Sequence, residues 1–206
     1  MIKDIVFPQN NETEFLEIAG KLGIKKLYFA YDFNDFFNKN IQKKLENIED
    51  KKTGFEPIFL VNNKNFGKAA KQSRTLAAKS SDNDKMMIES KKIKIIYGFE
   101  EMQRKDFIHQ RASGLNHVLC GLARKNNTAI GFSYSSIISG NKAQSAIIMG
   151  RMMQNINLCG KYKNKTIITS FSGNPYDLRA YHDISSLFRL MGMDDNAIKN
   201  SFSYSF

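Results

Sequence analysis

The sequence has few of the residues on which small metal-bound or disulfide-bonded proteins depend. Of its 206 residues, only two are cysteine, Cys120 and Cys159, and only three are histidine. Neither cysteine has a second Cys or His at zinc-finger spacing, and two thiols are too few for a disulfide scaffold. We therefore expect both cysteines to be buried free thiols.

Long apolar runs are also missing. Apolar runs such as residues 58–61 and 146–149 fall far short of the roughly 20 residues of a membrane span, and the first residues lack the apolar stretch of a signal peptide. Hydrophobic residues nevertheless make up 42% of the chain, which is enough to form a core. The composition predicts one folded domain over residues 1–206, in the cytoplasm.

Signature motifs of several enzyme classes do not occur. The sequence contains no Walker loop, Rossmann glycine fingerprint or Gly-x-Ser-x-Gly elbow. A metallohydrolase needs several converging His and carboxylate ligands, but His109, His117 and His182 all lie away from predicted strand ends. The serine run at 133–136 fits phosphate binding or turn formation, and both interpretations stay open. We therefore predict no catalytic residue and no metal ligand in this chain.

Positive charge is the one compositional anomaly. The chain has 31 Lys and Arg against 20 Asp and Glu, which gives a formal charge of +11. Such an excess favours a polyanionic partner, whether RNA, DNA or an acidic protein, although solvated helix faces explain part of it.

The order of apolar segments predicts alternating strands and helices. Strands are expected at residues 4–7, 27–31, 57–61, 93–97, 128–132 and 166–171, with a weaker one at 86–88. Helices are expected at 11–22, 35–49, 66–78, from 113 onward, at 141–162 and at 175–191. This alternation is typical of a parallel sheet with helical crossovers. We predict a TIM-barrel-like (βα) barrel, incomplete or distorted because the chain is short for eight units.

Several segments of the C-terminal half resemble one family closely. They are QRKDFIHQRASGLNHVLC at 103–120, AIGFSYSS at 129–136, GRMMQNINLCGKYK at 150–163, TSF at 169–171, PYDLR at 175–179 and HDISSLFRLMGM at 182–193. Together they resemble ribonuclease P protein component 3, the archaeal counterpart of the eukaryotic thirty-kilodalton ribonuclease P subunit. Gln110 and Ala112 depart from the His and Asn usual in that family, so contacts there are expected to be weaker.

The resemblance implies a barrel related to the polymerase-and-histidinol-phosphatase barrels and a role as a protein subunit of ribonuclease P. That ribonucleoprotein removes the 5′ leader from precursor tRNA, and its RNA subunit uses the catalytic magnesium ions, so no cofactor is expected on this chain. The implied partners are ribonuclease P RNA, component 2, the other protein subunits and precursor tRNA. Binding to a membrane is not expected. The isolated chain is expected to be inactive.

Basic and polar residues in the matched segments are candidates for RNA or partner binding. They are Arg104, Lys105, Arg111, Arg151, Gln154, Asn155 and Arg179. Cations at these positions would offset repulsion between RNA phosphates, so their removal is expected to raise the magnesium requirement of the assembled enzyme. The alternative function is an autonomous barrel phosphoesterase that uses a metal ion.

Overall fold

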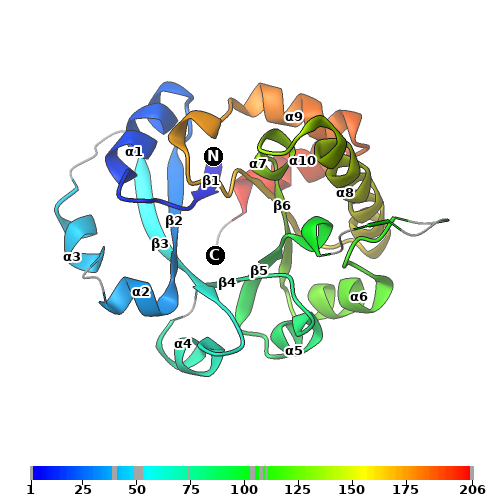
Figure 1. Ribbon diagram of the computed structural model, residues 1–206, viewed down its shortest axis with the longest axis horizontal. Helices are drawn as coiled ribbons and strands as arrows, with labels where there is room; N and C mark the ends of the chain where they lie inside the picture. The colour runs from blue at the N-terminus through cyan, green and yellow to red at the C-terminus, as the bar shows by residue number, and fades with distance from the viewer. Residues whose placement is uncertain are drawn as a thin grey trace.

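The architecture is a ring of seven parallel strands surrounded by helices (Figure 1). It is known from a computed structural model, which describes residues 2–38, 41–48, 53–73, 75–102, 105–106, 109 and 111–204. The strands follow one another around the ring in chain order, each paired in parallel with the next. They are β1 (Lys3–Val6), β2 (Lys26–Asp32), β3 (Gly54–Val61), β4 (Leu76–Lys79), β5 (Ile93–Tyr97), β6 (Ala129–Ser133) and β7 (Thr166–Thr169). The prediction of a TIM-barrel-like fold is confirmed.

Helices connect the strands and cover the outside of the ring (Figure 1). They are α1 (Glu12–Lys21), α2 (Phe33–Asn38), α3 (Ile41–Glu46), α4 (Phe66–Gln72), α5 (Asp84–Glu89), α6 (His117–Lys125), α7 (Ser135–Ile138), α8 (Lys142–Tyr162), α9 (Tyr181–Leu190) and α10 (Asp195–Ser203), with 3-10 turns η1 (Phe99–Glu101) and η2 (Pro175–Asp177). None of the helices in the described ranges is long and apolar enough to cross a membrane.

Strand residues point alternately into the barrel and out toward the helices. In β2, Tyr28 and Ala30 belong to a buried cluster drawn from every strand, whereas Leu27 and Phe29 pack in a second cluster with α1. The first cluster draws on no helix, so it is the interior of the barrel. Ala30, Ala77 and Ala129 contribute to it, and their small side chains leave room for the larger ones in a narrow ring.

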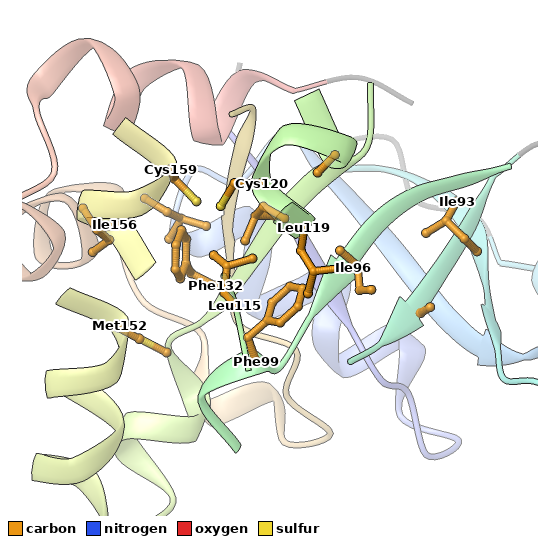
Figure 2. Close-up of a cluster of buried hydrophobic side chains, with 14 of the residues drawn as sticks. Ile93, Ile96, Phe99, Leu115, Leu119, Cys120, Phe132, Met152, Ile156 and Cys159 are labelled. Carbon is orange, nitrogen blue, oxygen red and sulfur yellow. The ribbon is translucent and has the colours of Figure 1, made fainter. Parts of the chain in front are cut away.

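The outer core is largest between β5, β6 and helices α6 and α8. Figure 2 shows Phe99 of η1, Phe132 of β6, Leu119 of α6 and Met152 of α8 converging there. Cys120 on α6 and Cys159 on α8 are free and buried, with their sulfur atoms turned toward each other (Figure 2). The prediction of two buried thiols is confirmed.

A buried aspartate bridges the seam where β7 meets β1. Asp4 accepts hydrogen bonds from the Thr169 hydroxyl, from the Ser170 amide at 2.7 Å and from the Tyr134 hydroxyl at 2.8 Å. Beyond β7, the Phe171 amide donates to the Ile5 carbonyl at 2.9 Å. These bonds join the first and last strands, so seven strands are enough to bring the ring nearly to closure.

The C-terminal residues cover the same seam. The sequence predicts no convincing final strand and helix over residues 194–206 and leaves a short edge strand open at 201–206. In the structure α10 includes residues 201–203 and packs against β7 and β1. Ser201 and Thr166 are hydrogen-bonded through their hydroxyls at 2.5 Å, and Lys3 Nζ donates to the Tyr204 carbonyl at 3.0 Å. The segment therefore completes the barrel wall near the amino-terminal ends of these two strands.

Several expected elements differ in the structure. The helix expected at 35–49 is described as two helices, α2 and α3, and the helix expected at 175–191 begins only at Tyr181, after η2. The end of the helix expected at 66–78 is strand β4, and the weak strand expected at 86–88 lies within α5. Ser113 does not begin a helix: α6 begins at His117, after Asn116, whose side chain accepts from the Leu119 amide.

Candidate functional site

Aromatic rings fill the centre of the barrel mouth at the carboxyl ends of the strands, where barrel enzymes bind their substrates. Phe7 follows β1, Tyr97 ends β5 and Phe171 follows β7. The rings of Tyr97 and Phe171 stack with centroids 3.9 Å apart, and Phe7 stacks on Phe171 at 5.4 Å. Phe171 has φ 48°, a left-handed conformation that costs a side chain of this size on the order of 1 kcal/mol. Protein side chains thus occupy the position of a barrel active site.

The serine run after β6 forms local bonds beside this mouth. Ser133 donates to the Ser170 carbonyl at 3.0 Å, and Ser136 donates to the Ser133 carbonyl at 2.7 Å. Both hydroxyls are donors within the fold, which favours turn formation over phosphate binding. In the part of the chain that the structure describes, no group of three or more His, Cys, Asp or Glu residues is placed to hold a metal ion.

A buried polar network lies between η1 and α8. Asn155 Nδ2 donates to Glu100 Oε1 at 2.7 Å, and the Ser113 hydroxyl donates to Asn155 Oδ1 at 2.5 Å. Glu100 is 1% exposed and Asn155 is 0% exposed. Burial raises the pKa of Glu100 to about 7, although the hydrogen bond from Asn155 opposes the shift.

A second network joins the first through Arg151. Its Nε donates to Asp106 Oδ1 at 2.7 Å, and its Nη1 donates to the Glu100 carbonyl at 2.8 Å. Arg111 Nη1 lies 3.2 Å from Asp106 Oδ2, and the Ala112 amide donates to Asp106 Oδ1 at 2.9 Å. Desolvation disfavours the charged form of Asp106, but these hydrogen bonds and the two arginines outweigh it and lower its pKa.

Gly150 lets Arg111 lie against α8. A Cβ at position 150 would overlap the Arg111 guanidinium, so this arginine crosses the helix where it has no side chain. The stretch that carries Lys105, Asp106 and Arg111 is therefore held on α8 by ion pairs, hydrogen bonds and close packing. We call it the anchored segment, meaning residues 105–106 and 111–116.

The structure brings some of the predicted binding residues together on this side of the barrel and separates others. Lys105 and Arg111 are exposed, and Gln154 is half-buried. Arg179 lies after η2 and donates to the Tyr176 and Leu178 carbonyls at 2.7 and 2.9 Å. Arg104 lies outside the described residues.

Two of the predicted binding residues are not on an exposed face of α8. Arg151 is 2% exposed and Asn155 is 0% exposed, because both occupy the buried stripe of α8 together with Met152 and Ile156. Their hydrogen-bonding groups face Glu100, Asp106 and Ser113 rather than solvent. These two residues therefore position the anchored segment, and a direct contact of either with RNA or a partner stays a prediction.

Sequence reasoning did not identify Glu100, Asp106, Ser113 and Gly150 as members of this site. The sequence does contain a signal for a buried polar network, because Arg151 and Asn155 share the helical spacing of the apolar residues 148, 152, 156 and 159. Polar residues within an apolar stripe indicate a buried network rather than a solvated face.

Comparisons with known proteins agree on one family. The sequence model of RNase P subunit p30 matches residues 102–205. Ribonuclease P protein component 3 of Thermococcus kodakarensis is 32% identical over 91 residues, which are 44% of this chain and 41% of that protein. The component 3 protein of Thermococcus gammatolerans is 29% identical over 121 residues, 59% of this chain and 53% of the relative. The matches thus span about half or less of the relatives' own length.

A solved structure has the same fold. A chain in the cryo-EM structure of archaeal ribonuclease P with mature tRNA superposes with a TM-score of 0.75 at 16% identity, covering 98% of this chain and 87% of the other. At that identity the likeness concerns the fold alone. The family match covers the anchored segment and everything from α6 through α10. The chain therefore belongs to the RNase P subunit p30 family.

Proposed function

We propose that this chain is a protein subunit of ribonuclease P, which removes the 5′ leader from precursor tRNA, and that it acts in the cytoplasm. The observation that carries the proposal is the family match over residues 102–205. The name shared by the curated relatives and the fold shared with a chain of archaeal ribonuclease P support it.

Catalysis is assigned to the RNA subunit with its magnesium ions, and this chain is assigned no cofactor of its own. The stacked rings of Phe7, Tyr97 and Phe171 support this assignment, because they fill the place where a barrel enzyme would bind its substrate. The alternative, an autonomous barrel phosphoesterase, has no comparable support.

The anchored segment provides the proposed contact with ribonuclease P RNA or with component 2. Lys105 and Arg111 are both exposed on a backbone that Asp106 and Arg151 hold in place, and Arg111 is also paired with Asp106. Gln154 on α8 extends this candidate surface, and Arg104 belongs to it by sequence, whereas Arg179 after η2 is a separate candidate contact. Guanidinium groups suit paired hydrogen bonds to phosphate or carboxylate oxygens.

The physical contribution of such a subunit is charge neutralisation. Folding of a large RNA brings phosphates together, and bound magnesium offsets their repulsion. A cationic protein surface takes over part of this task and releases counterions, so less magnesium is needed.

Reconstitution tests the function. The cognate RNA and component 2 would be assayed for leader removal from precursor tRNA, with and without this chain. We expect the chain to increase cleavage at limiting magnesium and to cleave nothing alone. Cleavage that is the same with and without the chain at every magnesium concentration would reject the proposed role, and cleavage by the chain alone would support the phosphoesterase.

A further inference from the structure

Several helices end on a residue with left-handed backbone at the amino-terminal end of the barrel. Gly23 and Gly192 are the second residues after α1 and α9, with φ 73° and 93°. Lys91 and Asn127 are the second residues after α5 and α6, with φ 60° and 58°, and Lys163 directly follows α8, with φ 53°. Glycine is the usual residue there because it has no Cβ to clash.

Lysine is an unfavourable choice for this position. A side chain other than Asn or Asp costs about 1 kcal/mol relative to glycine in the left-handed region. Lys91 and Lys163 are both exposed, so their side chains gain no core packing in return. Two lysines at positions where glycine would be more stable suggest that their charge has a use outside the fold.

More lysines surround these two. We call the whole set the αβ-end lysines, because each lies where a helix ends and the next strand begins. Figure 1 shows the four helices that precede them, α4, α5, α6 and α8, following one another around the barrel. The set consists of Lys71, Lys91, Lys92, Lys94, Lys125, Lys161, Lys163 and Lys165.

None of the αβ-end lysines forms an ion pair with a carboxylate in the described parts of the chain. Carboxylates nearby are few: Glu89 ends α5, and Asp194 accepts the Ala197 amide at the start of α10. The positive charge at this end is therefore largely uncompensated.

Two hollows lie among these lysines. One, of about 390 Å³, is lined by Lys71, Lys91, Lys92 and Lys94, together with the polar groups of Gln72 and Ser73. The other, of about 570 Å³, is lined in part by Lys163, Lys165, Asn157, Asn164 and Asn200, with Asp194 as its one carboxylate. Each hollow combines ammonium groups with neutral hydrogen-bonding groups, as phosphate and ribose oxygens require.

The opposite end of the same barrel units has a different charge. The strand-to-helix links after β4 and β5 carry Asp82, Asp84, Glu100, Glu101 and Asp106. Two cations at that end are paired, because Lys79 lies 2.6 Å from Glu101 and Arg111 lies 3.2 Å from Asp106, whereas Lys85 and Lys105 form no ion pair within the described residues. The carboxylates at that end nevertheless offset most of its positive charge, so unpaired lysines are more numerous at the amino-terminal end.

We propose that the amino-terminal end of the barrel, from the end of α4 to the start of β7, binds the phosphate backbone of RNA. This surface is separate from the anchored segment. Lysine provides compact, mobile charges that follow phosphates without reading bases, so the expected binding is independent of sequence. That the RNA is ribonuclease P RNA rests on the proposed function.

Lys91 and Lys163 have left-handed backbone conformations, so replacing them by glycine removes their charge without destabilising the fold. An effect on RNA binding can then be distinguished from an effect on stability. The double variant Lys91→Gly/Lys163→Gly is expected to unfold at an equal or higher temperature than the native chain. Its affinity for ribonuclease P RNA in about 100 mM KCl should fall roughly five- to tenfold, and the slope of log affinity against log salt should fall by about two. A second variant, Lys92→Gln/Lys165→Gln, removes two charges without changing a left-handed residue and should weaken binding similarly.

The matched control removes the same charge at the other end. Lys64 follows β3 and Lys142 begins α8, and both are exposed. Lys64→Gln/Lys142→Gln should lower affinity less than either test variant and should leave the salt slope nearly unchanged. If both test variants bind ribonuclease P RNA no more weakly than this control, the inference is wrong.

Two further measurements identify the partner and separate the inference from the proposed function. If the test variants keep RNA affinity but lose binding to polyglutamate, the surface serves an acidic protein and the RNA assignment is overturned. If the native chain supports leader removal but the test variants bind RNA with the same affinity as the native chain, this inference fails and the proposed function is retained. If the native chain does not support leader removal but binds RNA through these lysines, the function fails and the surface stands.

Discussion

Asp4 is the single residue on which closure of the barrel depends most. It is 4% exposed and accepts hydrogen bonds from Tyr134, Thr169 and Ser170 across the seam. Removing it would leave the Tyr134 hydroxyl and the Ser170 amide buried without this acceptor, whereas the Thr169 hydroxyl keeps the Ile5 carbonyl at 3.0 Å. Buried donors without an acceptor cost about 1–3 kcal/mol each in proteins.

We therefore predict that Asp4→Ala lowers the free energy of unfolding by about 3 kcal/mol or more, measured by urea denaturation. Asp195→Ala is a suitable comparison, because it removes a carboxylate paired with Arg189 at the surface, where the carboxylate is 73% exposed. That variant should lose less than about 1 kcal/mol. Equal losses in the two variants would show that the seam does not depend on Asp4.

Glu100 should make stability depend on pH near neutrality. Burial in the folded chain raises the pKa of Glu100 from an ordinary value of 4.5 to about 7. The folded state therefore binds more protons than the unfolded state between these values, so stability falls as pH rises from about 4.5 to about 7.

Glu100→Gln should remove this contribution while its amide oxygen still accepts from Asn155 Nδ2. The difference in unfolding free energy between the native chain and the variant should change by up to about 3 kcal/mol across that pH range, with the native chain losing relative stability as pH rises. A constant difference from pH 4.5 to 7.5 would show that Glu100 is charged throughout.

At the scale of elements, α8 connects core and candidate surface. Its buried stripe holds Arg151 and Asn155, and its Gly150 makes room for Arg111. Alanine favours a helix over glycine by about 1 kcal/mol, but a Cβ at position 150 must displace the Arg111 guanidinium from its place beside Asp106.

We predict that Gly150→Ala stabilises the protein by less than Gly121→Ala, where no atom lies within 4 Å of the added Cβ. Thermal unfolding would measure this difference. In reconstituted ribonuclease P, Gly150→Ala should raise the magnesium needed for half-maximal leader removal, whereas Gly121→Ala should not. The same magnesium dependence in both variants would argue against a role for the Arg111 position.

Elements with strong apolar runs could be predicted from the sequence, and short ones could not. The strand from Ile93 to Tyr97 could be predicted with its full length, because only Lys94 interrupts its run of buried apolar residues. Strand β4 has the sequence LAAK, and alanines and lysine read equally well as the end of a helix, so only the pairing of β4 with β3 and β5 decides its state. In α10, Ile198 and Phe202 are buried but isolated among polar residues.

For the molecule as a whole, the sequence indicated the family but not which residues face outward. The resemblance led to Arg151 and Asn155 as well as to Lys105 and Arg111, and only the packing of α8 against η1 separates the buried pair from the exposed pair. Likewise, the charge of +11 predicted a polyanionic partner, but the gathering of lysines at one end depends on the arrangement of strands into a ring.

The magnesium dependence of leader removal by reconstituted ribonuclease P, measured with and without this chain, tests the central claim most directly. We predict that adding the chain to the cognate RNA and component 2 shifts the half-maximal magnesium concentration downward. Replacing Lys105, Arg111 and Arg179 together with alanine, or the αβ-end lysines with glutamine, should reverse part of this shift. A magnesium profile that does not change when the native chain is added would contradict the account.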